Sequence, residues 1–476
     1  MNEKNVKTVA FCTLGCKVNQ YETDAMMELF GSHGYEVTEF SGKADVYVVN
    51  TCSVTSMADR KSRQMLHRAK KKNPDSVIVA TGCYVQTAGD ALLEDGSIDL
   101  IIGNNQKKDI VDIVESYRHT FDSEYTTEDN RKISENTQNT QNTENTEKKS
   151  YIKDLNHKPE YEQLNISTVS EHTRAYIKIQ DGCNQFCSYC IIPYARGRVR
   201  SRNEADIVAE VKRLTANHYK EIVLTGIHIS SYGMDFEGEN YNDHPHDGSH
   251  LLHLIQSIAQ VEGVMRIRLG SLEPQIITDE FAKALSEIPQ ICAHFHLSLQ
   301  SGCDATLKRM NRHYTAEEYK RGCDTLRRWF DHPALTTDVI VGFPGETDEE
   351  FEICKAFLED ISFAQMHIFK YSKRQGTRAA VMENQVDEQI KTKRSDILLA
   401  LDAKLQQEYR DFWAERPMEV LLEEDVEIDG KTYMTGHSKE YIKVAVPKNN
   451  EKSNDIIKVK SIGQNSKEFM NCERMD

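Results

Sequence analysis

The sequence lacks the two features that would place a chain in or across a membrane. Residues Met1–Lys7 carry mixed charge, and the apolar stretch that follows, Val9–Phe11, is too short for the core of an export signal. No apolar run approaches the roughly 18 residues that a membrane-spanning helix needs. We therefore expect a cytoplasmic protein with no membrane partner. In that compartment, functional cysteines are metal ligands or reactive thiols more often than disulfides.

The composition is also poor in the signals of fibrous and disordered chains. With 10 Pro and 24 Gly among 476 residues, the chain as a whole is neither collagen-like nor disordered. At about 100–200 residues per domain, the length predicts roughly two to four domains. The 59 Lys and Arg are outnumbered by 75 Asp and Glu, and the net charge of −16 argues against unselective coating of nucleic acid. A local basic groove stays compatible with that balance.

The first part of the chain predicts an α/β domain. In residues 1–118, short β-type runs alternate with amphipathic stretches, which indicates a mostly parallel sheet covered on both faces. Residues 119–165 differ, because four successive (Glu/Gln)-Asn-Thr triplets lie between Glu135 and Thr146 among almost no apolar residues. We expect this range to be a low-complexity linker or insertion.

The rest of the chain predicts a second α/β domain and a small β domain. Residues 166–400 repeat the alternation of strand and helix over six units, which favours an open, partial (β/α)6 barrel. A connecting helix at 401–416 leads to residues 417–476, where short strands separated by turn residues predict a small β-barrel.

Three of the 12 cysteines form a compact motif directly after the first strand of the second α/β domain. Cys183, Cys187 and Cys190 have the spacing C-x3-C-x2-C. Three thiolates leave a metal with an open coordination position, and a 4Fe-4S cluster held in this way has one iron free to bind substrate. Zinc with a distant fourth ligand, or three thiols packed as small hydrophobic groups, remain the alternatives.

Three further cysteines each follow a predicted strand of the first domain. They are Cys16, Cys52 and Cys83. Parallel strands end at the same edge of a sheet, so we expect the three thiols to converge and to hold a second cluster. Gly15 and Gly82 precede two of them and permit a tight exit from the strand. Any one of these cysteines taken alone would be interpreted as a buried structural thiol.

The motif C-x3-C-x-(aromatic)-C on the first loop of a partial barrel resembles the radical S-adenosylmethionine superfamily. The segments TLGC, NTC and TGC around Cys16, Cys52 and Cys83, together with the final β-barrel, are similar to the methylthiotransferase branch, whose last domain is the RNA-binding TRAM domain. Within that branch, TLGCKVNQYE resembles the enzymes that act on N6-threonylcarbamoyladenosine in tRNA. A different methylthiotransferase substrate and a zinc-stabilised RNA-binding scaffold without chemistry are the competing hypotheses.

The resemblance implies two 4Fe-4S clusters and S-adenosylmethionine as cofactors. The cluster at Cys183, Cys187 and Cys190 would cleave S-adenosylmethionine, and the auxiliary cluster at the other triad would serve transfer of a methylthio group to carbon 2 of the adenosine at position 37. Further cofactor contacts are expected at barrel strand ends and beside the third cysteine; they are Tyr189, Gly226, Glu273, Gln300 and Asp338. Ordinary capping side chains are the alternative for the strand-end residues.

The implied partners are tRNA, through its anticodon loop, and an electron donor such as a flavodoxin or ferredoxin. The source of the sulfur stays open. We expect four alternating arginines to clamp RNA phosphates; they are Arg196, Arg198, Arg200 and Arg202. A second basic run occupies positions 60–72, for which a solvated helix face is the alternative. His244, His246, His250 and His253 lie in a polar stretch where a metal site is not favoured.

Overall fold

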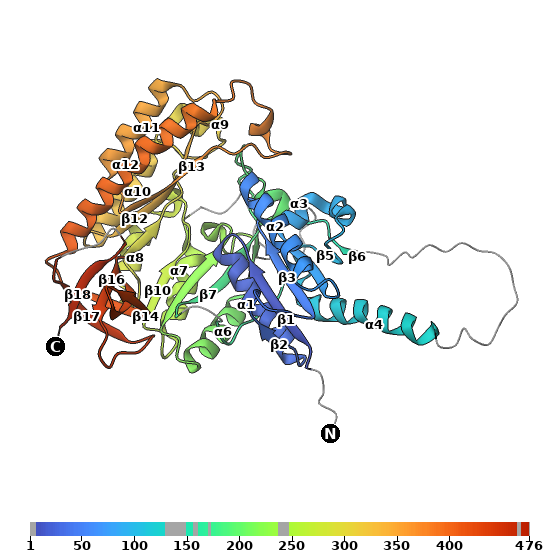
Figure 1. Ribbon diagram of the computed structural model, residues 1–476. Helices are drawn as coiled ribbons and strands as arrows, with labels where there is room; N and C mark the ends of the chain where they lie inside the picture. Colours follow the sequence, from blue (N-terminus) through green and yellow to red (C-terminus); the bar gives the residue numbers. More distant parts are fainter. Residues whose placement is uncertain are drawn as a thin grey trace, which may run out of the picture. The chain divides into compact units, whose positions relative to one another are not determined.

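The computed structural model describes residues 6–128, 149–155, 160–169, 173–236, 247–463 and 468–475. The chain divides into two compact units (Figure 1). Unit 1 comprises Met1–Ile166 and Ile191–Arg198, and unit 2 comprises Ser167–Cys190 and Val199–Asp476. The triplet tract lies outside the described residues. The range 166–400, predicted to form the barrel, is not wholly in unit 2, because its segment Ile191–Arg198 belongs to unit 1.

Unit 1 is built on a six-stranded sheet in the order β2-β1-β3-β4-β5-β6, with every pair of neighbours parallel. The strands are β1 (Thr8–Thr13), β2 (Glu36–Thr38), β3 (Val46–Thr51), β4 (Val77–Gly82), β5 (Leu100–Ile102) and β6 (Lys149–Tyr151). Every residue of β3 and β4 is buried, as expected for central strands covered on both faces. The predicted parallel α/β domain is confirmed.

Helices cover both faces of this sheet. The helices of this unit are α1 (Lys17–Ser32), α2 (Ser56–Lys72), α3 (Cys83–Ala88), α4 (Ile110–Glu128) and α5 (Ile192–Arg196), of which α1 to α4 pack on the sheet; short 3₁₀ helices lie at Gly89–Glu94 and Lys107–Asp109. Apolar residues of α1 and α4, such as Phe30 and Val114, pack in one core cluster. Residues of α2 and α3, such as Leu66 and Val85, pack in the other. The end of α4 and strand β6 fall in the range 119–165, so the part of it that the structure describes is not only linker.

Unit 2 contains six parallel strands in the order β7-β9-β10-β11-β12-β13, with β8 antiparallel at the edge of β7. Two isolated parallel bridges join the β10 and β11 regions. The strands are β7 (Ala175–Asp181), β8 (Arg200–Ser201), β9 (Glu221–Gly226), β10 (Arg266–Leu269), β11 (His294–His296), β12 (Ala334–Val341) and β13 (Gln365–Lys370). This is the predicted partial barrel.

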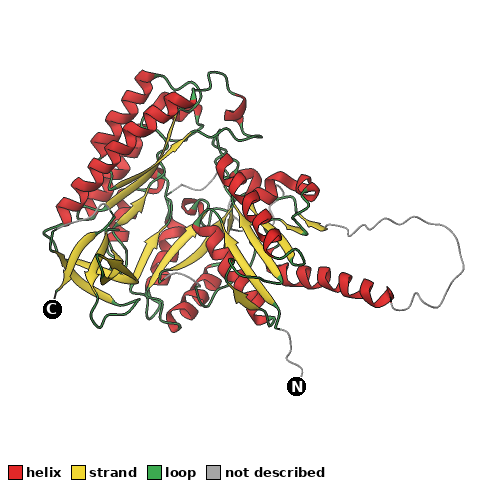
Figure 2. Ribbon diagram, viewed as in Figure 1, coloured by secondary structure: helices red, strands yellow, loops and turns green. Residues whose placement is uncertain are grey.

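Helices follow the barrel strands, as Figure 2 shows in red. They are α6 (Glu204–Ala216), α7 (Ser249–Ala259), α8 (Asp279–Ser286), α9 (Asp304–Arg309), α10 (Ala316–Trp329) and α11 (Asp348–Ile361), with 3₁₀ helices at Ile229–Ser231, Pro274–Ile276 and Arg378–Val381. The last two helices of this series begin at capping boxes, in which Thr315 pairs with Glu318 and Thr347 with Glu350.

The long helix α12 (Glu388–Trp413) leads into a closed five-stranded barrel in the order β14-β15-β16-β18-β17. Its strands are β14 (Met418–Ile428), β15 (Lys431–Ser438), β16 (Lys443–Pro447), β17 (Ile456–Ser461) and β18 (Met470–Arg474). Closure removes exposed strand edges and confirms the predicted small β-barrel. Among the residues that the structure describes, no helix is both long enough and apolar enough to span a membrane.

Candidate functional site

The three cysteines of unit 1 lie at the carboxyl ends of three neighbouring strands. Cys16 caps the amino terminus of α1 after β1, Cys52 directly follows β3, and Cys83 opens α3 after β4. Burial raises the pKa of the Cys52 thiol to about 11, and the charges of Cys83 and Cys16 add to the increase. The topology therefore brings the predicted triad together.

Two glycines allow these strand ends to approach one another. Gly15 has φ +106°, and a Cβ there would lie 2.8 Å from the Cys52 sulfur. Gly82 has φ +96°, and a Cβ there would lie 2.5 Å from the Thr51 carbonyl oxygen. Both positions need a left-handed backbone and have no room for a side chain, so only glycine fits them without distortion.

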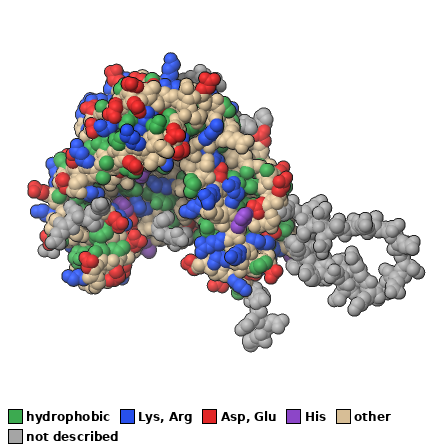
Figure 3. Space-filling model, turned by 45° about the horizontal axis from the view of Figure 1, so that its top comes forward, with side chains coloured by type: hydrophobic (Ala, Val, Ile, Leu, Met, Phe, Trp, Pro, Cys, Tyr) green, Lys and Arg blue, Asp and Glu red, His purple; other side chains and the backbone are tan. Residues whose placement is uncertain are grey.

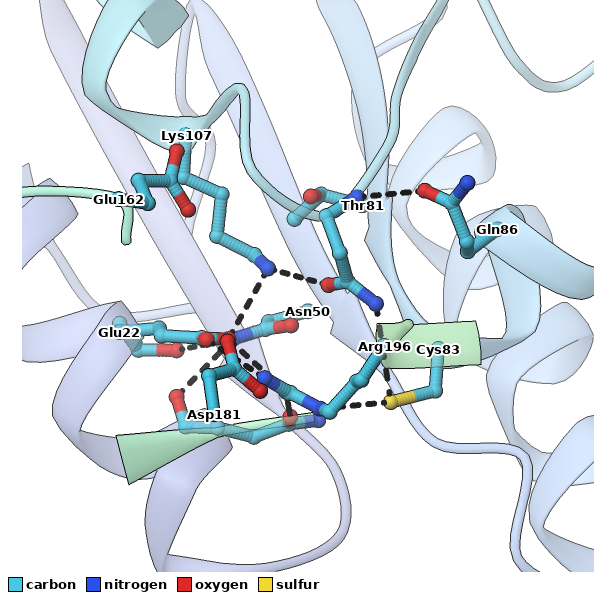
Figure 4. Close-up of polar contacts among 12 residues, drawn as sticks. Glu22, Asn50, Thr81, Cys83, Gln86, Lys107, Glu162, Asp181 and Arg196 are labelled. Atoms are coloured by element: carbon cyan, nitrogen blue, oxygen red, sulfur yellow. Dashed lines mark hydrogen bonds and ion pairs between the residues drawn. The ribbon is translucent and has the colours of Figure 1, made fainter. Parts of the chain in front are cut away.

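A buried arginine contacts one thiol of this triad (Figure 4). Arg196, from α5, has no exposed surface, and its Nε donates to the Cys83 sulfur over 3.3 Å. Its Nη1 donates to Glu22 Oε1 over 2.8 Å, and its Nη2 donates to Asn19 Oδ1 over 2.7 Å. Lys107 Nζ lies 3.0 Å from Glu22 Oε2. Charge-assisted hydrogen bonds thus hold the guanidinium against the sulfur.

Two buried asparagines tie the surrounding backbone to this group. Asn19 Nδ2 donates to the carbonyl oxygens of Leu14 and Thr51, which precede two of the cysteines. Asn104 donates to the Ala195 carbonyl oxygen over 2.8 Å and accepts from Lys107 over 2.5 Å. No sequence signal indicated Asn104 and Lys107. Asn19 and Glu22 lie in the segment TLGCKVNQYE, but no function was predicted for either.

The three cysteines of unit 2 lie on one loop after β7. Burial raises the pKa of the Cys183 thiol, with smaller contributions from Cys190 and Cys187. The loop is anchored to the segment that follows α9, because Ser188 N donates to the Met310 carbonyl oxygen over 2.9 Å. Asn311 Nδ2 also donates to the carbonyl oxygens of Gln185 and Phe186. The loop is therefore anchored both between Cys183 and Cys187 and between Cys187 and Cys190.

A second buried arginine contacts a thiol of this loop. Arg312 Nη1 donates to the Cys187 sulfur over 3.2 Å, and Nη2 donates to both carboxylate oxygens of Glu273 over 2.7 and 2.6 Å. Burial alone would raise the pKa of Glu273, but Arg312 and then His228 lower it to about 2. The predicted residue Glu273 therefore lies beside the cysteine loop as a carboxylate. Arg312 was missed, because a single arginine carries no spacing signal.

The other predicted cofactor residues do not all meet: Tyr189 lies on the cysteine loop, Gly226 ends β9, Gln300 follows β11 and Asp338 lies within β12. The Tyr189 ring packs edge-on against Phe343, with ring centroids 6.5 Å apart. Gly226 ends β9, where a Cβ would lie 3.0 Å from the Gln180 carbonyl oxygen. Gln300 N donates to the Asp338 carbonyl oxygen over 2.9 Å. The Asp338 side chain faces two histidines, which sequence analysis also missed.

The spacing of the sulfurs bears on the kind of metal that each triad fits. In the described part of the chain, His296, Asp338 and His367 are the one group of three or more possible ligands whose atoms all lie within 4.8 Å of one another. In each cysteine triad, at least one pair of sulfurs is therefore more than 4.8 Å apart. Tetrahedral zinc with bonds of about 2.3 Å would need sulfurs about 3.8 Å apart. The triads fit a multi-iron cluster better than a single zinc ion.

The arginines expected to clamp RNA require a correction. Arg196, Arg200 and Arg202 are buried, and Arg202 pairs with the buried carboxylate of Glu210. Arg200 lies 3.5 Å from Asp181. A phosphate clamp needs an exposed guanidinium, so the structure contradicts this function for these three residues. Arg198 is half-buried, and its assignment remains a prediction.

Exposed basic side chains are available elsewhere in unit 1. On α2 they are Arg60, Lys61, Arg63, Arg68 and Lys71. Over the face of the molecule drawn in Figure 3, basic side chains in blue alternate with acidic side chains in red. This distribution accords with a net acidic chain that carries local basic surface. Of the four histidines in the polar stretch, His244 and His246 lie outside the described residues, and His253 Nε2 lies 3.5 Å from Glu204.

Two family profiles match the chain. The Uncharacterized protein family UPF0004 matches residues 8–103, and the Radical SAM superfamily matches residues 177–358. The first covers the triad of unit 1, and the second covers the cysteine loop of unit 2. The two motifs are thus recognised independently of each other.

Related proteins match over nearly the whole length. Threonylcarbamoyladenosine tRNA methylthiotransferase MtaB of Bacillus subtilis (strain 168) is 40% identical over 95% of this chain and 93% of its own length. The protein of the same name from Aquifex aeolicus (strain VF5) is 38% identical over 84% of this chain and 89% of its own. The tRNA-2-methylthio-N(6)-dimethylallyladenosine synthase of Methylacidiphilum infernorum (isolate V4) is 31% identical over 94% and 91%.

A solved structure supports the fold. The radical S-adenosylmethionine methyltransferase TsrM from Kitasatospora setae, determined with cobalamin and a [4Fe-4S] cluster bound, has a TM-score of 0.55. It covers 79% of this chain and 77% of its own at 15% identity. At this identity the likeness concerns the arrangement of the backbone.

Proposed function

The chain belongs to the radical S-adenosylmethionine tRNA methylthiotransferases, and on this premise we propose that it methylthiolates carbon 2 of N6-threonylcarbamoyladenosine at position 37 of tRNA. The observation that carries the proposal is the pair of cysteine triads, one in each unit, within a chain whose relatives span both. The relatives that are 38–40% identical carry the threonylcarbamoyladenosine name, whereas a relative named for dimethylallyladenosine is 31% identical.

The cofactors of this family are S-adenosylmethionine and 4Fe-4S clusters, and the cysteines divide between two clusters. Cys183, Cys187 and Cys190 would hold the cluster that cleaves S-adenosylmethionine, and Cys16, Cys52 and Cys83 would hold the auxiliary cluster. When bound, these groups supply the radical chemistry that an unactivated C–H bond requires, which acid–base catalysis by side chains does not provide. The spacing of the sulfurs and the three-thiol sets support this assignment.

The protein side chains position these groups. Arg312 is held by Glu273 and donates to Cys187, so it would fix the cysteine loop and lessen the negative charge on its sulfur. Arg196 would do the same for Cys83. Tyr189, Gly226 and Gln300 remain proposed contacts of S-adenosylmethionine, because they lie on or near the strand ends where βα folds place reactive groups.

The partners are proposed on the same basis. The carboxy-terminal barrel, the exposed basic side chains of α2 and Arg198 would contact the anticodon arm of tRNA. A flavodoxin or ferredoxin would supply the electron, and the enzyme would act in the cytoplasm, where its tRNA substrate is found. The proposed reaction requires a one-electron donor, which supports a protein of this kind as partner.

Nucleoside mass spectrometry of tRNA is the decisive experiment. Bulk tRNA from a strain that lacks the gene should contain N6-threonylcarbamoyladenosine without its methylthio derivative, and the intact gene should restore that derivative. Unchanged amounts of the derivative in the deleted strain would refute the proposal. Loss of methylthio-isopentenyladenosine instead would favour the related substrate. Stoichiometric zinc with no iron after anaerobic reconstitution would favour a scaffold without chemistry.

A further inference from the structure

Three neighbouring barrel strands present polar side chains on one face. The parallel register places His296 of β11 beside Thr336 of β12, and Asp338 of β12 beside His367 of β13. The ligand atoms of His296, Asp338 and His367 all lie within 4.8 Å of one another. His296 Nδ1 lies 3.1 Å from Thr336 Oγ1, and its Nε2 is 3.6 Å from Asp338 Oδ2, which is too long for a hydrogen bond.

This face of the sheet is accessible, whereas the opposite face is packed. Side chains alternate along a strand, and on β12 the buried residues Thr337 and Val339 face away from Asp338. The Tyr319 hydroxyl of α10 lies 3.3 Å from Thr337 Oγ1, so α10 covers the packed face. Asp338 is half-buried and His367 is exposed. The polar cluster therefore remains open to a ligand.

An exposed aromatic ring extends the same face towards the cysteine loop of unit 2. Phe369 lies two residues beyond His367 on β13, is 46% exposed and pairs in register with Ile340. Ile340 and Tyr189, the residue before the third cysteine of the loop, pack against one hydrophobic cluster that includes Phe343. The end of this face at Ile340 and Phe369 is therefore nearer to the cysteine loop than the end at Thr336. Exposed aromatic rings are common stacking surfaces for nucleobases.

A cavity adjoins the other end of the face. It has a volume of about 250 Å³, and Thr336 and Gln365 contribute to its lining. These two residues pair in register one row before Asp338 and His367. Along the strands, the face thus runs from a cavity through a cluster of two imidazoles and a carboxylate to an aromatic ring. This order suits a nucleobase that carries a polar substituent.

We propose that this face binds the target adenosine, with Phe369 stacked on the base and His296, Asp338 and His367 recognising the N6-threonylcarbamoyl group. The inference rests on the proposed function. The substituent carries a carboxylate, a hydroxyl and ureido N–H groups, so the imidazoles can donate to its oxygens and Asp338 can accept from its N–H groups. An apolar isopentenyl group offers no donor or acceptor to these three polar side chains, which disfavours its binding.

The test compares binding of two anticodon stem-loops to the reconstituted enzyme by fluorescence anisotropy. One stem-loop carries N6-threonylcarbamoyladenosine at position 37, and the other carries adenosine. Wild-type enzyme should prefer the modified stem-loop, and His367→Leu should reduce that preference at least about 10-fold, as expected for loss of a charge-assisted hydrogen bond. Phe369→Ala should weaken binding of both stem-loops by a similar factor. His253→Leu, an exposed histidine on α7, is the matched control and should change neither.

The outcomes separate this inference from the proposed function. If wild-type enzyme methylthiolates threonylcarbamoyl tRNA while His367→Leu keeps the full binding preference, this inference alone is overturned. If wild-type enzyme does not act on that tRNA, the proposed function fails, and this inference fails with it. One non-iron divalent metal ion per chain, lost in His367→Leu and needed for binding, would replace direct recognition by a metal site.

Discussion

The two cysteine triads differ in how much of the fold each requires. Cys183, Cys187 and Cys190 occupy one short loop, whereas Cys16, Cys52 and Cys83 come from the ends of three strands of a parallel sheet. The loop is specified by local sequence. The other triad forms only when β1, β3 and β4 align, so its geometry depends on the packing of unit 1 as a whole.

The two triads nevertheless share one structural feature. In each, a buried arginine that pairs with a buried glutamate donates a hydrogen bond to one cysteine sulfur. Such a donor orients its ligand and tunes the electron density on the sulfur, as groups around metal ligands commonly do. We infer that the two sites should respond alike to loss of the arginine but should affect different steps of catalysis.

Replacing a cysteine of each triad should have the largest effect. Cys187→Ala should abolish cleavage of S-adenosylmethionine, whereas Cys52→Ala should leave some abortive cleavage without methylthiolated product. Iron content should fall from about eight to about four atoms per chain in each variant, because one of two clusters is lost. Cleavage assays and iron analysis under anaerobic conditions measure both effects. Equal loss of cleavage in the two variants would contradict the division between the triads.

Removing the buried arginine of unit 1 should have the next largest effect. Arg196→Leu leaves the Glu22 carboxylate buried without its guanidinium partner, which should destabilise unit 1 by about 3–5 kcal/mol. Arg196→Lys keeps the charge but cannot reproduce the bond from Nε to Cys83, so the reduction potential of the auxiliary cluster should fall. Urea unfolding and redox titration followed by EPR measure these changes.

The Arg196 variants need a protein that holds only the auxiliary cluster and a control at another buried arginine. The titration is cleanest with Cys183, Cys187 and Cys190 changed to Ala, because one cluster then remains. Arg202→Lys is the matched control, since Arg202 is an equally buried arginine that pairs with Glu210. An unchanged potential in Arg196→Lys would show that the contact with Cys83 is not a tuning interaction.

Substituting Gly82 should have a smaller effect that is confined to unit 1. In Gly82→Ala the new Cβ would lie 2.5 Å from the Thr51 carbonyl oxygen at a φ of +96°, so backbone strain and steric overlap should cost about 2–4 kcal/mol. Auxiliary iron should fall while cleavage of S-adenosylmethionine is retained. Gly34→Ala is the control, because φ is +83° there but no atom lies within 4 Å of the added Cβ. Similar losses in both variants would mean that backbone strain, and not crowding at the triad, is responsible.

The contrast between local and distant contacts also explains what could be predicted from the sequence. The Cys183 loop and the alternation of strands and helices are local patterns, and the structure bears out the fold that they predict. The burial of Arg196 is not a local property, since its partner Glu22 lies 174 positions away. The alternating arginines therefore predicted a phosphate clamp, although three of the four form buried ion pairs in the structure. The cluster at His296 and His367 was missed for the same reason, because only the strand register brings them together.

A buried arginine–glutamate group that contacts none of the six predicted cysteine ligands tests whether such pairs matter to the cysteines or only to folding. Glu221 lies 2.8 Å from Arg268 and 3.3 Å from Arg266 in unit 2. Burial would raise the pKa of Glu221, but Arg268 and Arg266 lower it to about 2, below its ordinary value of 4.5. Its contribution to stability is therefore complete above about pH 4.5 and is lost as the pH falls through about 2.

Glu221→Gln should remove this pH dependence. Wild-type unit 2 should lose roughly 2–3 kcal/mol of stability from this group between about pH 4.5 and 2, and the variant should lack that part of the decline. The variant should be less stable at pH 7, because two arginines lose a buried anion. Its iron content should equal that of the wild type if the pairs at Arg196 and Arg312 act through their sulfur contacts. Urea unfolding across this pH range, with iron measured at pH 7, distinguishes a general need for buried ion pairs from a specific interaction with the cysteine ligands.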